Sequence, residues 1–461
     1  MCAAVPLPGS AVSDWLIRNA RLVNEGRQFD ADLRIRGGRI ERIDGNLDAR
    51  PGEQVLDAHG RWLLPGMVDD QVHFREPGLE HKGDLATESS AAVAGGITTV
   101  MEMPNTRPPT LDAVALQDKY DRAAGRCRAN FGFYMGASND NLAHIQRVDP
   151  KATPGIKVFM GASTGNMLVD DPAILDAIFR DAPTPIITHC EDTPTIDATM
   201  AQFRAKYDDA LTPDMHPDIR SREACIKSTR LALELARGHG TRLHVLHIST
   251  ADELALFERG PLVDANGKRR KQITAETCIH FLRFDRRDYA TRGNFIKCNP
   301  AIKESSDREA LIAALVDDTI DVLATDHAPH TLEEKQQPYI TAPSGLPLVQ
   351  DALLAALELV HEGRVSLLQI VDKLAHAPVQ LFDVKERGYL REGYFADLVL
   401  VDPQAGHMVE RANVLSKCGW SPFEGVRFRS RIDAAFVNGE LAWDGQRLIG
   451  APNGQRLEFA R

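Results

Sequence analysis

The chain has 461 residues, of which 43% are hydrophobic and 26% are charged, and 65 acidic against 54 basic side chains give a formal net charge of −11. This composition is too apolar for a disordered chain, and no stretch approaches the roughly 20 apolar residues that a membrane-spanning helix needs. An acidic chain without a long Lys/Arg run also lacks the charge pattern that binds phosphate backbones, which argues against a nucleic acid partner.

The two ends of the chain share a β-rich texture. Short alternating runs separated by glycine and aspartate fill residues 15–64 and 388–448. Because chain ends often lie close together, we expect residues 1–64 and 384–461 to form one small β-sandwich domain. Residues 1–13 lack the basic start and apolar core of a secretory signal, and the seven cysteines are scattered without a C-x-x-C pair. We therefore expect a loose leader on a cytoplasmic protein.

The middle of the chain, residues 65–383, alternates short apolar runs with amphipathic helical patterns such as those after Pro172, Ser221 and Asp307. The candidate strands cover 66–74, 97–103, 130–135, 156–160, 185–189, 242–248, 272–277 and 321–326. Strands that alternate with helices at this spacing predict an α/β fold with a TIM (β/α)8 barrel. A large doubly wound sheet would produce much the same texture and stays an alternative at this point.

Polar side chains gather at the carboxyl ends of these strands, where the chemistry of a barrel takes place. They are His73, Glu102, Asn105, His189, His247 and Asp326, with Lys157 near the start of the fourth strand. Neutral imidazole nitrogens and carboxylate oxygens are ligands that Zn²⁺ prefers. A single histidine after an apolar strand is more often a hydrogen-bonded structural residue. Three histidines and an aspartate at one barrel mouth, however, predict a metal site.

Lys157 needs a separate explanation, because an ammonium group beside a metal ion would be repelled. Burial lowers the pKa of a lysine, and a neutral amine can add CO₂ to give a carbamate with two oxygens that can bridge two metals. A lysine that extends to solvent is the ordinary alternative. The position of Lys157 between two histidine-bearing strands favours the bridging role.

Ordered motifs along the whole chain resemble the dihydroorotase family of the amidohydrolase superfamily. They are DDQVHFREPG (69–78), MEMPNT (101–106), GIKVFMGASTGN (155–166), THCED (188–192), LHVLHIST (243–250), KCNPAIK (297–303), TDHAPH (325–330), GYLREGYFADLVLVDP (388–403) and SPFEG (421–425). The resemblance implies a zinc-dependent cyclic amidohydrolase. Its reaction would be the reversible cyclisation of N-carbamoyl-L-aspartate to (S)-dihydroorotate, with loss of water, in pyrimidine biosynthesis.

The resemblance also implies the metal ligands. Lys157 would be a carboxylated ligand that bridges two Zn²⁺ ions, His189 and His247 would bind the more exposed metal, and His73 and Asp326 the more buried one. Asp326 would also be the catalytic general base and acid, which passes a proton from metal-bound water to the ring nitrogen.

Four further residues match positions that bind the substrate: Arg75, Asn105, Asn299 and His330. Arg75 offers the planar fork that suits a carboxylate. The polar, Pro- and Gly-rich segment 331–348 follows His330. Loops of this kind often close over a substrate, and we expect the backbone of residues 342–345 to contact the pyrimidine ring.

The chain departs from the family pattern at Gln71, which replaces the first histidine of the usual His-x-His motif. A neutral amide oxygen is a poor zinc ligand beside imidazole, so Gln71 would be a weak or absent ligand. We expect one firmly held Zn²⁺ and a second site of doubtful occupancy. By strand alternation Gln71 lies on the same face as His73, Asp70 points away, and His244 packs outside the barrel, opposite His247.

Two other functions remain as alternatives. One is an allantoinase or dihydropyrimidinase, which would share the metal site but would not need Arg75 at that position. The other is a non-catalytic dihydroorotase-like scaffold subunit, which would be expected to lose several ligands, whereas this chain lacks one. We expect a homodimer or other homo-oligomer that binds N-carbamoyl-L-aspartate and dihydroorotate, and neither nucleic acid nor membrane.

Overall fold

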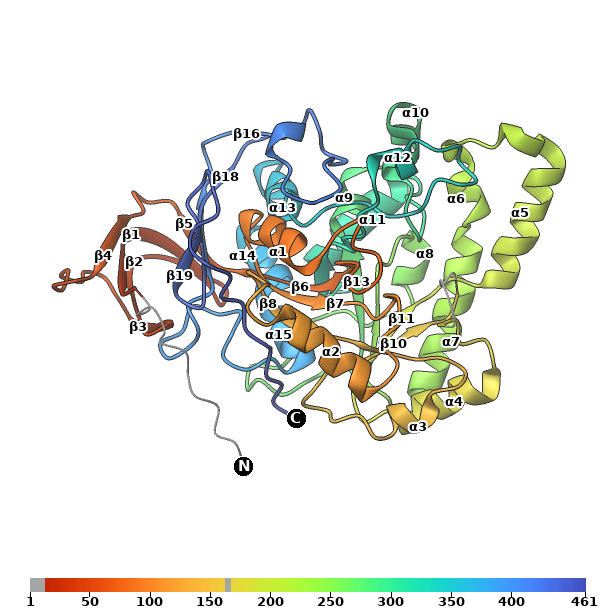
Figure 1. The fold of residues 1–461 in the computed structure, drawn as a ribbon, viewed down its shortest axis with the longest axis horizontal. Coiled ribbons are helices and arrows are strands. Elements are labelled where there is room, and N and C mark those ends of the chain that lie inside the picture. Colours follow the sequence, from red (N-terminus) through yellow and green to blue (C-terminus); the bar gives the residue numbers. More distant parts are fainter. Residues whose placement is uncertain (1–12, 162–166) are drawn as a thin grey trace.

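The structure is a computed structural model that describes residues 13–161 and 167–461. Segments from both ends of the chain share one mixed sheet in the order β19-β18-β15-β5-β1-β2-β3, with β4 paired to β1. Its strands are β1 (Trp15–Asn24), β2 (Arg27–Arg36), β3 (Arg39–Asp44), β4 (Gln54–Asp57), β5 (Trp62–Pro65), β15 (Leu398–Asp402), β18 (Arg431–Val437) and β19 (Glu440–Trp443). The antiparallel pairing of β5 with β15 joins the two ends. Figure 1 shows β1 to β5 at the left, away from most helices.

This sheet has its own apolar cluster, separate from the main core. The cluster includes Leu22, Leu33, Leu63, Leu398 and Phe436, none of which is exposed to solvent. Alternating residues of each strand supply these side chains, which is the expected pattern of a half-buried antiparallel strand. The sequence therefore specifies a β unit with an interior of its own.

The middle of the chain forms parallel ladders. The strands β6 (Met67–Val72), β7 (Ile97–Glu102) and β8 (Asn130–Phe133) pair in that order. A second ladder contains β9 (Met135–Gly136), β10 (Ile156–Phe159), β11 (Ile186–His189), β12 (Leu243–Val245), β13 (Ile273–Cys278) and β14 (Val322–Ala324). Each of the predicted strand ranges overlaps an observed strand, so the α/β fold is confirmed.

Two details connect these ladders to each other. Only Tyr134 separates β8 from β9. At the other end, Val72 forms a parallel bridge with His327, three residues past β14, so that the first and last strands also meet. The carboxyl ends of all these strands consequently point toward one region of the molecule.

Helices connect successive strands and pack against them. The longer ones are α1 (Leu85–Ala94), α2 (Ala113–Ala123), α4 (Pro172–Asp181), α5 (Thr193–Tyr207), α7 (Arg222–His239), α11 (Ser305–Val316) and α13 (Ala352–His361). The shorter ones are α3 (Leu142–Ile145), α6 (His216–Ile219), α8 (Ala251–Leu254), α9 (Ile279–Arg283), α10 (Tyr289–Arg292), α12 (Leu332–Lys335), α14 (Leu367–Val371) and α15 (Ala377–Phe382). The predicted helices correspond to α4, α7 and α11. Their starts are set by local capping, since Asp171 and Ser221 accept hydrogen bonds from the first turns of α4 and α7.

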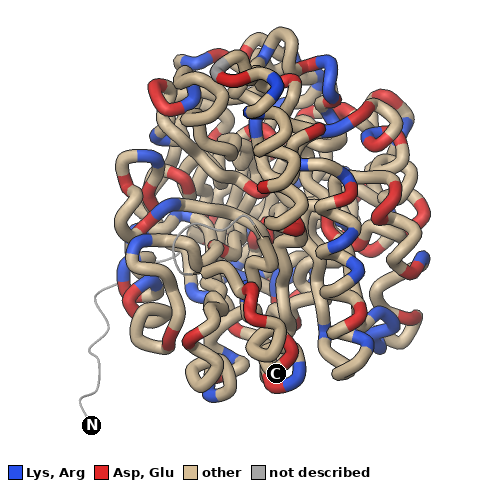
Figure 2. The backbone as a smooth tube through the Cα atoms, turned by 90° about the vertical axis from the view of Figure 1, so that its right-hand side faces the viewer, with Lys and Arg blue, Asp and Glu red and all other residues tan. Residues whose placement is uncertain are grey.

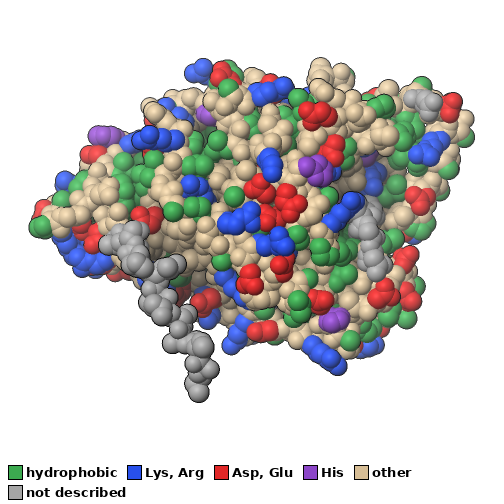
Figure 3. Space-filling view, in the orientation of Figure 1, with side chains coloured by type: hydrophobic (Ala, Val, Ile, Leu, Met, Phe, Trp, Pro, Cys, Tyr) green, Lys and Arg blue, Asp and Glu red, His purple; other side chains and the backbone are tan. Residues whose placement is uncertain are grey.

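Charges are mixed over the surface. Figure 2 shows acidic and basic residues interspersed around one side of the molecule, and Figure 3 shows the same mixture on another face. Within the described ranges, no helix is both long and apolar enough to cross a membrane.

Candidate active site

One cavity of about 590 Å³ lies at the carboxyl ends of the parallel strands and is lined by every residue predicted to bind metal or substrate. These are Gln71, His73, Arg75, Asn105, Lys157, His189, His247, Asn299, Asp326 and His330. They come from segments up to 259 positions apart in the sequence, between Gln71 and His330. The fold therefore brings together the whole predicted set.

His189 and His247 form the first pair in this cavity. His189 is the last residue of β11 and His247 lies two residues past β12, and their Nδ1 and Nε2 atoms are 2.9 Å apart. Burial lowers the pKa of both imidazoles, and for His247 the nearby His189 and Lys157 lower it further. Both rings are thus held neutral, which is the form that can bind a metal.

Glu191 orients the His189 ring through a hydrogen bond with Nε2. Its carboxylate accepts a hydrogen bond from His189 Nε2 at 3.1 Å and is paired with Arg220. Burial of Glu191 favours the neutral acid, but Arg220 and His189 outweigh it and lower the pKa to about 2. Because Nε2 donates to Glu191, the Nδ1 lone pair of His189 faces the cavity. Sequence reasoning missed Glu191, although it lies two residues after His189 in the THCED motif.

His73 and Asp326 form the second pair, with His73 Nε2 3.2 Å from Asp326 Oδ1. The amide oxygen of Asn105, an acceptor, lies 2.8 Å from His73 Nδ1, so Nδ1 carries the proton. Nε2 then directs a lone pair toward a carboxylate oxygen. Gln71 donates its amide to the same Asp326 oxygen at 3.0 Å, so its contact with Asp326 is made through a donor group.

Lys157 lies in β10 at the floor of the cavity and is 1% exposed. Burial lowers its pKa to about 8, although Asp326 and Glu276 counteract part of this effect. Its Nζ is 4.8 Å from the centre of the Phe159 ring. With this pKa about one tenth of the lysine is neutral at pH 7, and the neutral amine is the form that makes a carbamate.

These donors fit a zinc ion. The neutral imidazoles of His189 and His247, the carboxylate of Asp326 and the weakly basic Lys157 line the cavity together, and His73 Nε2 and Asp326 Oδ1 face each other as two acceptors. A cation placed among such acceptors relieves their repulsion and replaces the water they lose on burial.

The opposite wall of the cavity is cationic. Arg75 donates from Nε to the carbonyl of Pro329 at 3.1 Å, and its terminal NH₂ lies 3.1 Å from His330 Nε2. Lys82 Nζ lies 3.0 Å from His330 Nδ1, and His330 Nε2 lies 3.0 Å from the carbonyl oxygen of Ser344. Burial and the neighbouring Arg75 hold the pKa of His330 well below its usual range.

Two cations on this wall, Lys82 and Arg107, were not predicted. Both line the cavity, and Lys82 is also paired with Glu334 at 3.0 Å. Neither follows a strand directly, so the strand-end criterion does not select them. Asn299, which was predicted, accepts a hydrogen bond from the buried His216 at 3.2 Å and is held against the wall.

Residues 340–345, in the segment after His330, line the cavity. Two buried lysines hold the backbone of this segment: Lys297 donates to the carbonyls of Tyr339 and Ala342, both at 2.6 Å, and Lys335 donates to those of Pro343 and Gly345, both at 3.0 Å. The backbone of this loop is therefore fixed at the edge of the cavity by side chains that the sequence pattern does not identify.

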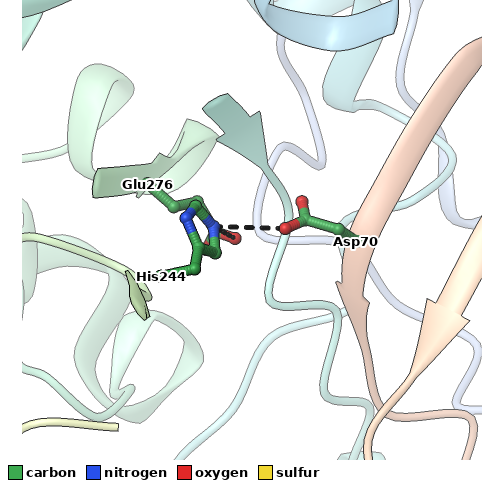
Figure 4. Close-up of side chains that lie close together, drawn as sticks. All are labelled: Asp70, His244 and Glu276. Carbon is green, nitrogen blue, oxygen red and sulfur yellow. Dashed lines mark hydrogen bonds and ion pairs between the residues drawn. The ribbon is translucent and has the colours of Figure 1, made fainter. Parts of the chain in front are cut away.

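His244 differs from its predicted position, whereas Asp70 does not. Figure 4 shows that His244 of β12 points toward Asp70 of β6 and lies beside Glu276 of β13. All three are buried, with at most 1% exposure, and they do not line the cavity. His244 was predicted to pack outside the barrel; this was wrong, because it faces the interior enclosed by the parallel strands. Asp70 does point away from the cavity, toward this interior.

Comparisons with known proteins agree with the geometry. Residues 62–442 match the amidohydrolase family, and the chain belongs to that family. The dihydroorotase of Halobacterium salinarum is 35% identical over 94% of this chain and 97% of its own length. The dihydroorotase of Methanosarcina mazei is 31% identical over 96% of this chain and 98% of its own. The predicted resemblance to dihydroorotases is confirmed.

A solved structure supports the fold. The L-hydantoinase (dihydropyrimidinase) from Arthrobacter aurescens superposes with a TM-score of 0.89 at 26% identity, covering 97% of this chain and 100% of its own. The three-dimensional likeness thus extends over both the β unit and the parallel ladders.

Proposed function

We propose that the protein is a dihydroorotase that interconverts N-carbamoyl-L-aspartate and (S)-dihydroorotate. The observation that carries this proposal is the two-sided cavity, in which imidazoles, Asp326 and Lys157 face a wall of Arg75, Lys82 and Arg107. Hydrolysis of a cyclic amide requires the side with the imidazoles, Asp326 and Lys157. A substrate with a free carboxylate explains the cationic wall. The curated relatives named dihydroorotase support the same substrate.

The metal would be Zn²⁺, held by His189, His247, His73, Asp326 and a carboxylated Lys157. When bound, it would supply an activated water and polarise the amide carbonyl. We expect one firmly held ion, because Gln71 offers an amide donor to Asp326 where a ligand would be needed for a strong second site.

The side chains of this chain then divide the remaining work. Asp326, next to His73, takes a proton from the attacking water and delivers it to the ring nitrogen. Arg75, His330, Asn105 and Asn299 hold the substrate carboxylate and fix the ring. The loop over the cavity excludes bulk water, which strengthens each of these electrostatic contacts.

The same proposal includes the domain organisation. Residues 65–383 would form a (β/α)8 barrel, supported by the bridge between Val72 and His327, and residues 1–64 and 384–461 would form a β sandwich, supported by their shared sheet. We also propose a cytoplasmic homo-oligomer. The six cysteines of the described ranges are all free and buried, as a reducing compartment permits. Sedimentation of the purified protein would test the oligomeric state.

Turnover of dihydroorotate, allantoin, dihydrouracil and hydantoin by one zinc-loaded preparation tests the function. We expect activity on dihydroorotate at least 100-fold above the neutral rings, because one charged hydrogen-bonded contact is worth about 1.5–3 kcal/mol and the wall offers more than one. Activity confined to allantoin or dihydrouracil would instead make it another cyclic amidohydrolase. A metal-loaded protein without any turnover would favour the scaffold role.

A further inference from the structure

We propose that Asp70, His244 and Glu276 form a second, structural Zn²⁺ site in the interior below the catalytic cavity (Figure 4). The three side chains come from β6, β12 and β13, and their ligand atoms all lie within 4.8 Å of one another. The residues proposed to hold the catalytic metal form a separate set.

The distances in this cluster suit a metal better than a hydrogen bond. His244 Nε2 lies 3.3 Å from Asp70 Oδ2 and 3.4 Å from Glu276 Oε2. Ordinary N–H···O bonds to charged groups are about 2.7–2.9 Å long, and one N–H shared between two oxygens at 3.3 and 3.4 Å makes only weak bonds. Tetrahedral ligands at about 2.0–2.1 Å from Zn²⁺ are separated by about 3.3–3.5 Å, which matches both distances.

The Nδ1 atom of His244 carries a proton. Nδ1 lies 2.8 Å from the hydroxyl of Thr274, and that hydroxyl itself donates to the carbonyl of Leu243 at 3.2 Å. Thr274 must therefore accept from Nδ1–H. Burial lowers the pKa of His244, but the facing carboxyl groups of Asp70 and Glu276 outweigh this effect and raise the pKa to about 9. Nε2 therefore carries a proton when no metal is bound, and Zn²⁺ would displace that proton. A histidine that donates one N–H to the protein and aims its other nitrogen at carboxylates is the usual arrangement of a metal ligand.

Asp70 provides a second and independent observation. It is 0% exposed, and neither of its carboxyl oxygens accepts a hydrogen bond from the described residues, although Oδ2 forms the 3.3 Å ion pair with His244. The nearby hydroxyl of Tyr134 donates its hydrogen bond to the backbone carbonyl of Asp70, not to the carboxyl group of the side chain. A buried carboxyl group without hydrogen bonds costs several kcal/mol, and a bound cation removes this cost.

The site would act on the catalytic cavity through Glu276. Its Oε1 atom accepts a hydrogen bond from the backbone N–H of His247 at 3.2 Å, and His247 has a positive φ of 41°. A metal that fixes Glu276 therefore also fixes the strained turn that aims His247 into the cavity. The ion itself would be structural, because its ligands do not line the cavity.

Zinc content of the full-length protein tests the proposal. Asp70→Asn and His244→Gln are compared with wild type after purification in zinc and removal of loose metal. The matched control is Asp69→Asn, which changes the neighbouring buried carboxyl group that Thr325 already satisfies. We expect both cluster variants to hold about one zinc equivalent less than wild type, and the control to hold the same amount.

Equal zinc in the wild type and both cluster variants would overturn the proposal and mean that the cluster holds a proton instead. If the variants do not fold, anomalous X-ray scattering at the zinc edge from wild-type crystals decides. A peak bonded to all three side chains supports the site, and its absence overturns it. Dihydroorotate turnover is measured on the same samples. Inactive protein with the interior zinc present would count against the proposed function alone.

Discussion

Replacing Arg75 by lysine isolates the contribution of a planar cation to substrate choice. In the structure the guanidinium is anchored by the carbonyl of Pro329 and lies against His330, which leaves its remaining donors directed into the cavity. Burial lowers the pKa of Arg75 to about 10, so the group is charged throughout the neutral range. Lysine keeps the charge but loses the fork and the anchor.

The size of the effect follows from these contacts. A hydrogen bond to a charged group contributes about 1.5–3 kcal/mol, and one such bond to the substrate carboxylate should be lost in Arg75→Lys. At 1.4 kcal/mol per factor of ten, kcat/KM for dihydroorotate should fall about 10- to 150-fold. The loss should appear mostly in KM, since the carboxylate is held equally in the ground and transition states.

The assay compares dihydroorotate with dihydrouracil, the same ring without the carboxylate. For dihydrouracil we expect kcat/KM to change by less than about threefold. Arg107→Lys is the matched control, because Arg107 lines the same cavity but is exposed, and exposed ionic contacts contribute only about 0.2–1 kcal/mol. Equal losses for both substrates would refute the idea that Arg75 reads the carboxylate.

Three further changes test other parts of the site and fold. Glu191→Gln should weaken zinc binding about 10- to 100-fold, because the orientation of His189 is lost. Competition with a chelator measures the zinc affinity, and an unchanged affinity would contradict the orienting role of Glu191. Gln71→His should raise bound zinc by up to one equivalent, and an unchanged metal content would show that residue 71 does not limit the second ion. Burial, partly offset by Ser421, raises the pKa of Asp351 from 3.8 to about 6. The folded state therefore binds more protons than the unfolded state between these values, and stability falls as pH rises through this window. The advantage of Asp351→Asn over wild type in urea unfolding should grow by up to about 3 kcal/mol from pH 4 to pH 7, and a pH-independent difference would contradict the shift.

The regular elements were predictable because each carries a local signal. Buried parallel strands such as residues 156–160 and 185–189 read as short apolar runs, and α7 is bounded by a serine cap and by Gly240 in the left-handed conformation. Which strand lies beside which was predictable only through the family resemblance. The bridge between Val72 and His327 joins residues 255 positions apart, and no local pattern encodes it.

The net charge of −11 argued against a nucleic acid partner, but it did not predict the charges that line the active site. The cavity mouth carries Arg75, Lys82 and Arg107, while Glu334 pairs with Lys82. A local excess of cations on an acidic protein attracts a dianionic substrate over about one Debye length, roughly 8–10 Å at physiological salt. Composition averages over the whole surface and hides such a patch.

The site residues whose positions could not be derived from strand alternation share a backbone property. Arg75, His247 and Asp326 have positive φ values of 73°, 41° and 52°, and each lies just past the end of a strand. A residue in this conformation leaves the two-residue alternation, so counting from His247 back to His244 gives the wrong face for His244. Such conformations cost about 1–3 kcal/mol each and persist where surrounding contacts fix them, as Glu276 does for His247. Alternation therefore holds within the strands that support the site and fails at the strand ends that form it.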